Sequence, residues 1–149
     1  MKIVIGCDHG GFNLKGSIIE YLKANNYEIC DCGTFSTDSV DYPDYGLAVA
    51  EKVASGQFPK GIILCGTGIG ISICANKVKG VRAALCHDLF TAEACAMHNN
   101  ANVLAIGGRV VTPVQAVAIV DKWLNTPYEG GRHDKRLQKM KEIEDKYFK

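Results

Sequence analysis

A cysteine followed by three glycines at alternate positions is the feature of this sequence that most directly indicates chemistry. The apolar run 62–64 leads into Cys65, the glycines are Gly66, Gly68 and Gly70, and an amphipathic segment follows. This order predicts a strand, a tight loop and the start of a helix. Backbone N–H groups in such a loop converge on one point, and the helix dipole adds positive potential there. We therefore predict a cradle for an anion or a developing oxyanion, with a nucleophile or base at its edge.

The same loop does not match the common phosphate-binding motifs. It is not a Walker loop, because no Gly-Lys-Ser/Thr follows, and it lacks the complete dinucleotide fingerprint. A low-molecular-weight phosphatase would need an arginine that closes the loop, and none of the six residues after Cys65 is an arginine. Positive potential at the cradle favours the thiolate, which is the reactive form of cysteine. A glycine-rich turn that serves only packing remains the alternative.

Other residues suited to chemistry follow the predicted strands and helices. Asp8 and His9 come after the first strand, where they either cap a helix or contact a sugar hydroxyl and an anion. His98 follows a helix that is expected to end near Met97, and is either its C-terminal cap or a proton donor. The segment 42–45 is expected in a long loop, as a plain turn or as the wall of a pocket.

Composition restricts the class of protein. With 149 residues, 47% hydrophobic and 22% charged, the chain fits one globular domain over residues 1–149. The net charge of +1 gives no global attraction to nucleic acid or to a membrane surface. The chain shows no targeting signal and no apolar run of membrane-spanning length, so we expect a cytoplasmic protein. Seven cysteines without a Cys-x-x-Cys pair are expected to be reduced and mostly buried, and no metal site is predicted.

Short apolar runs alternate with amphipathic stretches along the chain. The predicted strands are 2–7, 27–32, 61–65, 82–86 and 103–106, and the predicted helices are 11–25, 44–55, 69–77, 88–97, 113–124 and 134–149. This alternation predicts an α/β fold, a three-layer αβα sandwich with a five-stranded parallel sheet of Rossmann-like type and an extra C-terminal helix. Ligands of such sheets bind beyond the carboxyl ends of the strands, where Asp8 and Cys65 are expected.

The C-terminal part departs from this alternation. Residues 125–133 are rich in turn-forming types and predict a linker to the final helix. Arg132, His133, Lys135 and Arg136 lie in or just before the first turn of that helix. Because cations there oppose the helix dipole, they suggest an anionic ligand or partner, although a solvated basic face explains them equally well.

Taken together, the motifs resemble those of the type B ribose-5-phosphate isomerases. The residues that carry this resemblance are, in chain order, 6–11, 41–44, 65–70 with 75–77, 98–102 and 130–133. They extend over nearly the whole chain in the order and spacing of the family. The family also contains isomerases that act on galactose 6-phosphate or allose 6-phosphate.

The resemblance implies an aldose–ketose isomerase that interconverts ribose 5-phosphate and ribulose 5-phosphate through a cis-enediolate, without metal or other cofactor. It implies that Cys65 moves the proton between C1 and C2, that Thr67 shifts protons on the oxygens, and that His98 assists ring opening. The implied substrate-binding residues are Asp8, His9, Tyr42, Gly66, Gly68, Ile69, Gly70, Asn99, Arg109, Arg132 and Arg136. Among these, His9, Arg132 and Arg136 would hold the phosphate.

The resemblance also implies a partner of the same kind. Members of the family are dimers or tetramers whose active sites lie across a subunit interface, so a homo-oligomer is expected. Some relatives use a glutamate as the base where this chain has Ile71, so the chain is of the cysteine type. The alternatives are a hexose-phosphate isomerase on the same scaffold and, as a different class, a non-catalytic module that binds phosphate or nucleotide.

Overall fold

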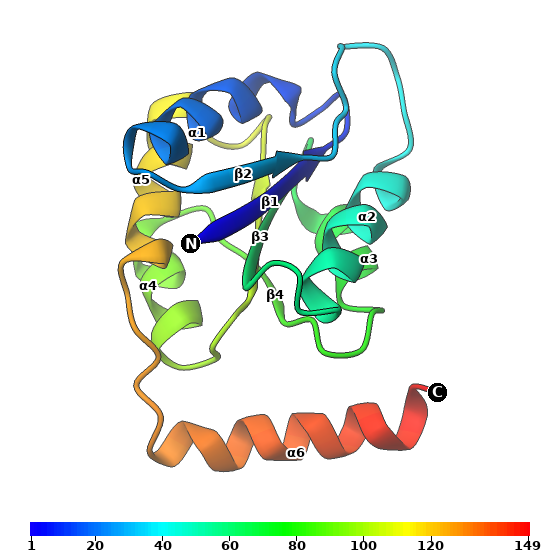
Figure 1. The fold of residues 1–149 in the computed structure, drawn as a ribbon, viewed down its shortest axis with the longest axis vertical. Helices are drawn as coiled ribbons and strands as arrows, with labels where there is room; N and C mark the ends of the chain where they lie inside the picture. Colours follow the sequence, from blue (N-terminus) through cyan, green and yellow to red (C-terminus); the bar gives the residue numbers. More distant parts are fainter.

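The computed structural model describes all residues, 1–149, and confirms the predicted alternation of strands and helices (Figure 1). The strands are β1 (Lys2–Cys7), β2 (Glu28–Asp31), β3 (Lys60–Cys65), β4 (Ala83–Leu85) and β5 (Val103–Gly107). The helices are α1 (Phe12–Ala24), α2 (Tyr42–Ala54), α3 (Ile69–Ala75), α4 (Leu89–Met97), α5 (Pro113–Leu124) and α6 (Arg132–Tyr147).

The five strands form one parallel sheet in the order β2-β1-β3-β5-β4. The central strands β1, β3 and β5 are almost entirely buried, whereas the edge strands β2 and β4 are partly exposed. A central parallel strand is covered on both faces, so only an almost continuous apolar run can occupy it. The apolar runs in the sequence therefore decide which strands lie in the middle.

Helices cover both faces of the sheet, which confirms the predicted three layers (Figure 1). On one face α1, α4 and α5 pack around the fully buried Trp123, together with Leu14 and Ile18. On the other face α2 and α3 contribute Val49 and Ile71 to a second, smaller cluster. Helix α5 begins with the capping box of Thr112 and Gln115, so its first backbone N–H groups are satisfied locally.

Two predicted boundaries are wrong for reasons of local chemistry. Residues 42–45 do not lie in a loop but form the first turn of α2, where Pro43 is tolerated because no intrahelical partner is needed for its missing N–H. Helix α6 begins at Arg132 rather than at residue 134, so the connector is residues 125–131. Gly130 and Gly131 both have positive φ, a conformation that a right-handed helix excludes, and they therefore end the connector.

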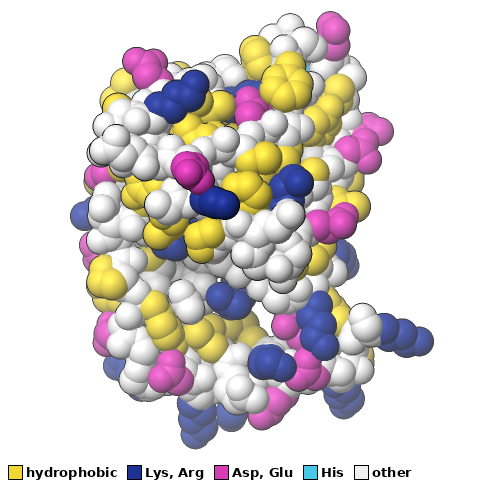
Figure 2. Space-filling view, in the orientation of Figure 1, with side chains coloured by type: hydrophobic (Ala, Val, Ile, Leu, Met, Phe, Trp, Pro, Cys, Tyr) yellow, Lys and Arg dark blue, Asp and Glu magenta, His cyan; other side chains and the backbone are white.

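Helix α6 lies apart from the two cores, below the ends at which the strands begin (Figure 1). The Gly80 N–H donates to Glu144 (2.9 Å), and Lys79 pairs with Asp145 (2.9 Å), which attaches the C-terminal half of the helix. A cavity of about 710 Å³ separates α6 from the body and opens as a hollow in Figure 2. The helix therefore forms one wall of this cavity and is not packed against the sheet.

The cysteines are all free, as expected, but burial divides them. The buried ones are Cys7, Cys65, Cys86 and Cys95, whereas Cys30, Cys32 and Cys74 are only partly buried. The expectation that most are buried is thus wrong for the latter three, because β2 is an edge strand and α3 lies near the surface. No helix is both long and apolar enough to cross a lipid bilayer.

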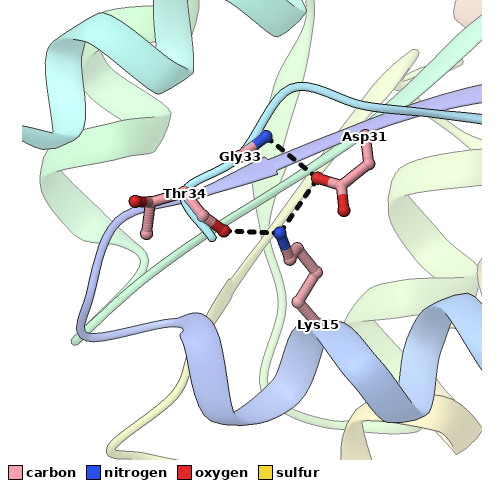
Figure 3. A network of polar contacts seen from close by, with 4 residues as sticks. All are labelled: Lys15, Asp31, Gly33 and Thr34. Carbon is pink, nitrogen blue, oxygen red and sulfur yellow. Dashed lines mark hydrogen bonds and ion pairs between the residues drawn. The ribbon is translucent and has the colours of Figure 1, made fainter. Parts of the chain in front are cut away.

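A buried lysine fixes the start of the connector between β2 and α2 (Figure 3). The ammonium of Lys15, a residue only 4% exposed, pairs with the Asp31 carboxylate (3.0 Å) and donates to the Thr34 carbonyl. The same carboxylate accepts the Gly33 N–H (2.9 Å), and the Phe35 ring lies 4.4 Å from the ammonium. The buried ammonium thus has both a counter-charge and a hydrogen-bond acceptor, as burial requires.

We expect Lys15→Met to lower the free energy of unfolding by roughly 2–3 kcal/mol, because it leaves the Asp31 carboxylate without its counter-charge. Urea denaturation measures this change. The matched control is Lys141→Met, which breaks the exposed pair with Asp145 and is expected to change stability far less than Lys15→Met. Equal effects of the two substitutions would contradict the structural role of the Lys15 network.

His133 is the one buried residue of α6 and joins the helix to the body. Its ring stacks on that of His98, at the end of α4, with 4.6 Å between centroids. Burial, followed by the neighbouring His98, lowers the pKa of His133; Arg132 and Arg136 act in the same direction, and Glu129 opposes them. The folded protein therefore favours the neutral imidazole.

A lowered pKa in the folded state means that the unfolded chain takes up the proton of His133 first, so protonation favours unfolding. We expect the unfolding free energy to fall as the pH drops below about 6.5, the ordinary value for histidine. The His133→Gln variant should lose less stability than the wild type between about pH 7.5 and about pH 5.5, a range above the titration of ordinary carboxylates. Identical losses in denaturation experiments would show that His133 is not responsible.

Candidate functional site

The exits of the three central strands meet at the carboxyl edge of the sheet. The Asp8 N–H donates to the Leu64 carbonyl (3.1 Å), which joins the exits of β1 and β3. The Gly108 N–H donates to the Cys65 carbonyl (2.8 Å), which joins the exits of β3 and β5. The connections after β1 and β3 go to opposite faces of the sheet, and such a point is where open α/β sheets bind ligands.

The predicted cradle is present around Cys65, which is 4% exposed. The Gly68 N–H donates to the sulfur of Cys65 (3.1 Å), and the Ile69 N–H donates to the hydroxyl oxygen of Thr67 (3.2 Å). Gly68 has φ +78°, which turns its amide back toward the cysteine. Helix α3 has only seven residues, so these individual amides, rather than a long helix dipole, supply most of the positive potential.

The cradle is closed from two sides by direct backbone and ring contacts. A Cβ on Gly107 would lie 2.6 Å from the carbonyl carbon of Thr67, so the exit of β5 contacts the loop backbone directly. A Cβ on Gly70 would lie 2.6 Å from the Tyr42 ring, which places the first residue of α2 over the loop. Close packing of this kind holds the amides in one orientation, as preorganised stabilisation requires.

Asp8 and His9 lie beside the loop in definite orientations. Asp8 does not cap α1, whose N-cap is Gly11; instead one carboxylate oxygen accepts the N–H groups of Gly10 (2.8 Å) and Gly11 (3.2 Å). This leaves its second oxygen for a ligand hydroxyl. The Nδ1 of His9 accepts the Val40 N–H (3.2 Å), so its Nε2 carries the proton of the neutral ring and can donate it to an anion.

Arg109 lies on the same edge, directly after β5. Its guanidinium nitrogen lies 2.8 Å from where a Cβ on Gly66 would stand, so it contacts the cradle at Gly66, whereas Tyr42 contacts it at Gly70. The side chain is exposed and belongs to none of the ion pairs of the chain. The carboxyl edge thus combines a thiol, oriented amides, a histidine and a free cation.

The structure does not bring the remaining predicted residues to this place. Within one chain, His98, Asn99, Arg132 and Arg136 all lie at the amino edge of the sheet, because α4 runs back along it and His98 is its C-cap. Strand β5, with five residues, separates the two edges by about 16 Å. One chain therefore presents the predicted residues as two separate groups.

The amino-edge group contains His133, which the sequence analysis counted among the cations near the start of the last helix but did not place in the site. His133, buried and stacked on His98, places α6 so that Arg132 and Arg136 lie near the end of α4. The two arginines are exposed and form no ion pair. The sequence does place His133 between Arg132 and Arg136, which could have indicated its role. The predicted helix began at residue 134, so His133 was assigned to the linker and not to the helix.

The amino edge is also where donor atoms suited to a metal gather. One donor atom each from His98, Glu129 and His133 lies within 4.8 Å of the others. The two imidazole rings, however, are stacked with an interplanar angle of 24°, whereas two histidines that share a metal direct their in-plane lone pairs at one point. The arrangement of the rings fits a stacked pair better than a metal centre.

Comparison with known proteins adds to this geometry. The profile of a family described as Ribose/Galactose Isomerase matches residues 3–140. The chain is 48% identical over 145 residues to ribose-5-phosphate isomerase B of Escherichia coli (strain K12), and the match covers 97% of each protein. The solved structure of ribose-5-phosphate isomerase B from Clostridium thermocellum is 55% identical, with a TM-score of 0.97 and 99% of both chains covered.

A further solved structure shows a relative with a ligand. Ribose-5-phosphate isomerase B from Mycoplasma genitalium, with bound ribulose-5-phosphate, is 42% identical with a TM-score of 0.94, and the match covers 97% of this chain and 96% of that one. These similarities extend over both edges of the sheet and over α6, and they confirm the predicted fold and the family resemblance drawn from the motifs. The chain belongs to the ribose/galactose isomerase family.

Proposed function

We propose that this protein interconverts ribose 5-phosphate and ribulose 5-phosphate, and that Cys65 is the base. The names of its relatives support the substrate. The observation that carries the role of Cys65 is the hydrogen bond from the Gly68 N–H to its sulfur, because an amide directed at sulfur stabilises a thiolate. A thiolate beside unshared amide donors suits the removal of a proton from carbon next to a carbonyl.

The proposed reaction moves one proton between two carbons. In the open-chain aldose, the Cys65 thiolate takes the proton from C2, and the electron pair of that bond forms the C1–C2 double bond of a cis-enediolate. The same thiol then returns the proton to C1, which yields the ketose. The Thr67 oxygen already accepts the Ile69 N–H, so its own O–H is free to exchange a proton with the substrate oxygens.

The barrier of such a reaction is mostly the negative charge that develops on the enediolate oxygens. The loop 66–70 supplies backbone N–H groups for this charge, and removal of one such donor typically costs about 3 kcal/mol in transition-state stabilisation. Close contacts with Gly107 and Tyr42 hold the loop, so the amides need little reorganisation during the reaction. The site supplies the stabilisation through amides of its own backbone.

We assign the other predicted residues to contacts with the phosphate and the sugar ring. His9 offers an Nε2–H, and Arg132 and Arg136 offer unpaired guanidinium groups, which suit bidentate contact with phosphate oxygens. Asp8 offers a free carboxylate oxygen to a sugar hydroxyl, Asn99 and Arg109 line the site, and His98 assists ring opening. Four of these residues lie at the amino edge, at the opposite end of the sheet from Cys65.

We therefore propose a homo-oligomer in which the carboxyl edge of one subunit meets the amino edge of another. A twofold axis brings both pairs of edges together and creates two equal sites. Large apolar side chains that are exposed at the carboxyl edge support such a contact; they are Ile69, Ile73, Leu89, Phe90, Val110 and Val114. In a monomer, this apolar surface would lie in water without a partner.

Cys65→Ala is expected to lower kcat for ribose 5-phosphate by about a hundred- to ten-thousand-fold, the usual contribution of a general base. The assay follows ketose formation by metal-free enzyme in EDTA, and Cys30→Ala, which changes a partly buried cysteine of β2, is the matched control. Undiminished turnover by Cys65→Ala would contradict the role of Cys65 as the base but not the proposed substrate. Faster conversion of allose 6-phosphate or galactose 6-phosphate by the wild type would instead show that a hexose phosphate is the preferred substrate.

Mixing two inactive variants tests the shared site. Cys65→Ala damages the carboxyl edge and Arg132→Glu the amino edge, where a glutamate in the first turn of α6 suits the helix dipole. After dissociation and random reassociation, half of the dimers are mixed, and each mixed dimer has one intact site. We expect recovery of about a quarter of the wild-type activity. Mixed dimers verified by mass that remain inactive would place all the required residues within one subunit.

A further inference from the structure

Two buried thiols face each other beside the exit of β4. Cys86, directly after β4, has its sulfur 3.6 Å from that of Cys95 in α4. Cys86 is 1% exposed and Cys95 is 6% exposed, and both lie in the larger apolar cluster. A covalent S–S bond is about 2.0 Å long, so the sulfurs would need to approach each other by only about 1.6 Å.

We propose that Cys86 and Cys95 form an intramolecular disulfide when the protein meets a hydroperoxide, which makes the pair a reversible site of oxidative modification. The pair joins the exit of β4 to the second turn of α4, across the short connection at 86–88. Contact between two thiols from different elements brings the sulfurs close enough for a disulfide to form after a small shift.

The chemistry follows from the hydrogen bond between the two thiols. The hydrogen bond between the two sulfurs lowers the pKa of Cys86 and raises the pKa of Cys95. Cys86 is therefore the better nucleophile of the two, and as a thiolate it attacks the peroxide O–O bond, forming a sulfenic acid and releasing one water. The Cys95 sulfur then attacks the sulfenic sulfur, its proton leaves with the hydroxyl as a second water, and the S–S bond forms. Two thiols lose two electrons in total, and hydrogen peroxide gains them.

One other pair of cysteines is close in sequence. Cys30 and Cys32 lie at the exposed edge formed by β2, with one residue between them. On an extended strand, residues two apart have Cα atoms about 6.6 Å from each other, near the upper limit that a disulfide spans. The Cys30 and Cys32 thiols also interact with each other, but the Cys86–Cys95 bond requires only a small shift between two packed elements.

The test is a map of disulfide linkage in the full-length protein. The protein is treated with hydrogen peroxide, its remaining thiols are alkylated, and it is digested with trypsin and Glu-C without reductant. Trypsin cuts after Arg82 and Arg109, and Glu-C cuts after Glu93, so Cys86 and Cys95 fall on separate peptides, 83–93 and 94–109. We expect these two peptides to be joined after peroxide and to separate on addition of dithiothreitol.

Cys65 provides the internal check of the treatment, because it lies on a different tryptic peptide, 61–77. Recovery of 83–93 and 94–109 as separate, alkylated peptides from a sample in which Cys65 is oxidised would overturn the proposal. In Cys95→Ala, where alanine keeps the small apolar volume, we expect Cys86 to be trapped as a sulfenic acid by dimedone. Absence of that adduct, with Cys65 again oxidised, would equally overturn it. The readout is linkage, so it does not depend on the proposed isomerase activity.

Discussion

The arrangement of this protein depends on the burial of three adjacent parallel strands, β1, β3 and β5. Their apolar residues exclude water from both faces of the sheet, so their carboxyl ends are held side by side. Backbone hydrogen bonds between the exits, such as that from Gly108 to the Cys65 carbonyl, extend this order beyond the sheet. The position of Cys65 relative to Asp8 and Arg109 is thus a consequence of packing in the core.

Packing also explains how the loop after β3 can serve as a rigid set of donors. Gly107 approaches the backbone of Thr67 so closely that any side chain would collide, and Gly68 adopts a conformation that directs its amide to sulfur. On the other side of β1, the Lys15 network fixes the start of the connector that reaches Val40, whose N–H orients His9. The orientation of a surface histidine is thereby linked to a buried ion pair.

The same sheet geometry separates the chemistry into two groups. Each helix of an α/β unit returns the chain to the amino edge, so the end of α4 and the start of α6 are necessarily far from Cys65. His133 stacks on His98 and gathers the free arginines of α6 on that edge. The homo-oligomer that we propose would resolve this separation, because a twofold axis would place unlike edges together, and the exposed apolar side chains near Cys65 offer a surface for it.

Much of this protein can be predicted from its sequence, because the relevant signals are local. Apolar runs define the strands, alternation with amphipathic stretches defines a parallel sheet, and the spacing of Cys65, Gly66, Gly68 and Gly70 defines a loop with converging amides. The predicted starts of α2 and α6 were wrong. Pro43 is compatible with a loop as well as with the first turn of a helix, and the sequence does not show that the glycines at 130–131 end the connector. The order of the strands, the hydrogen bond from Gly68 to sulfur, the buried stack of His133 on His98 and the contact between Cys86 and Cys95 join residues from different elements. Only the tertiary structure could decide these, because such contacts depend on distances in space that no spacing along the chain records.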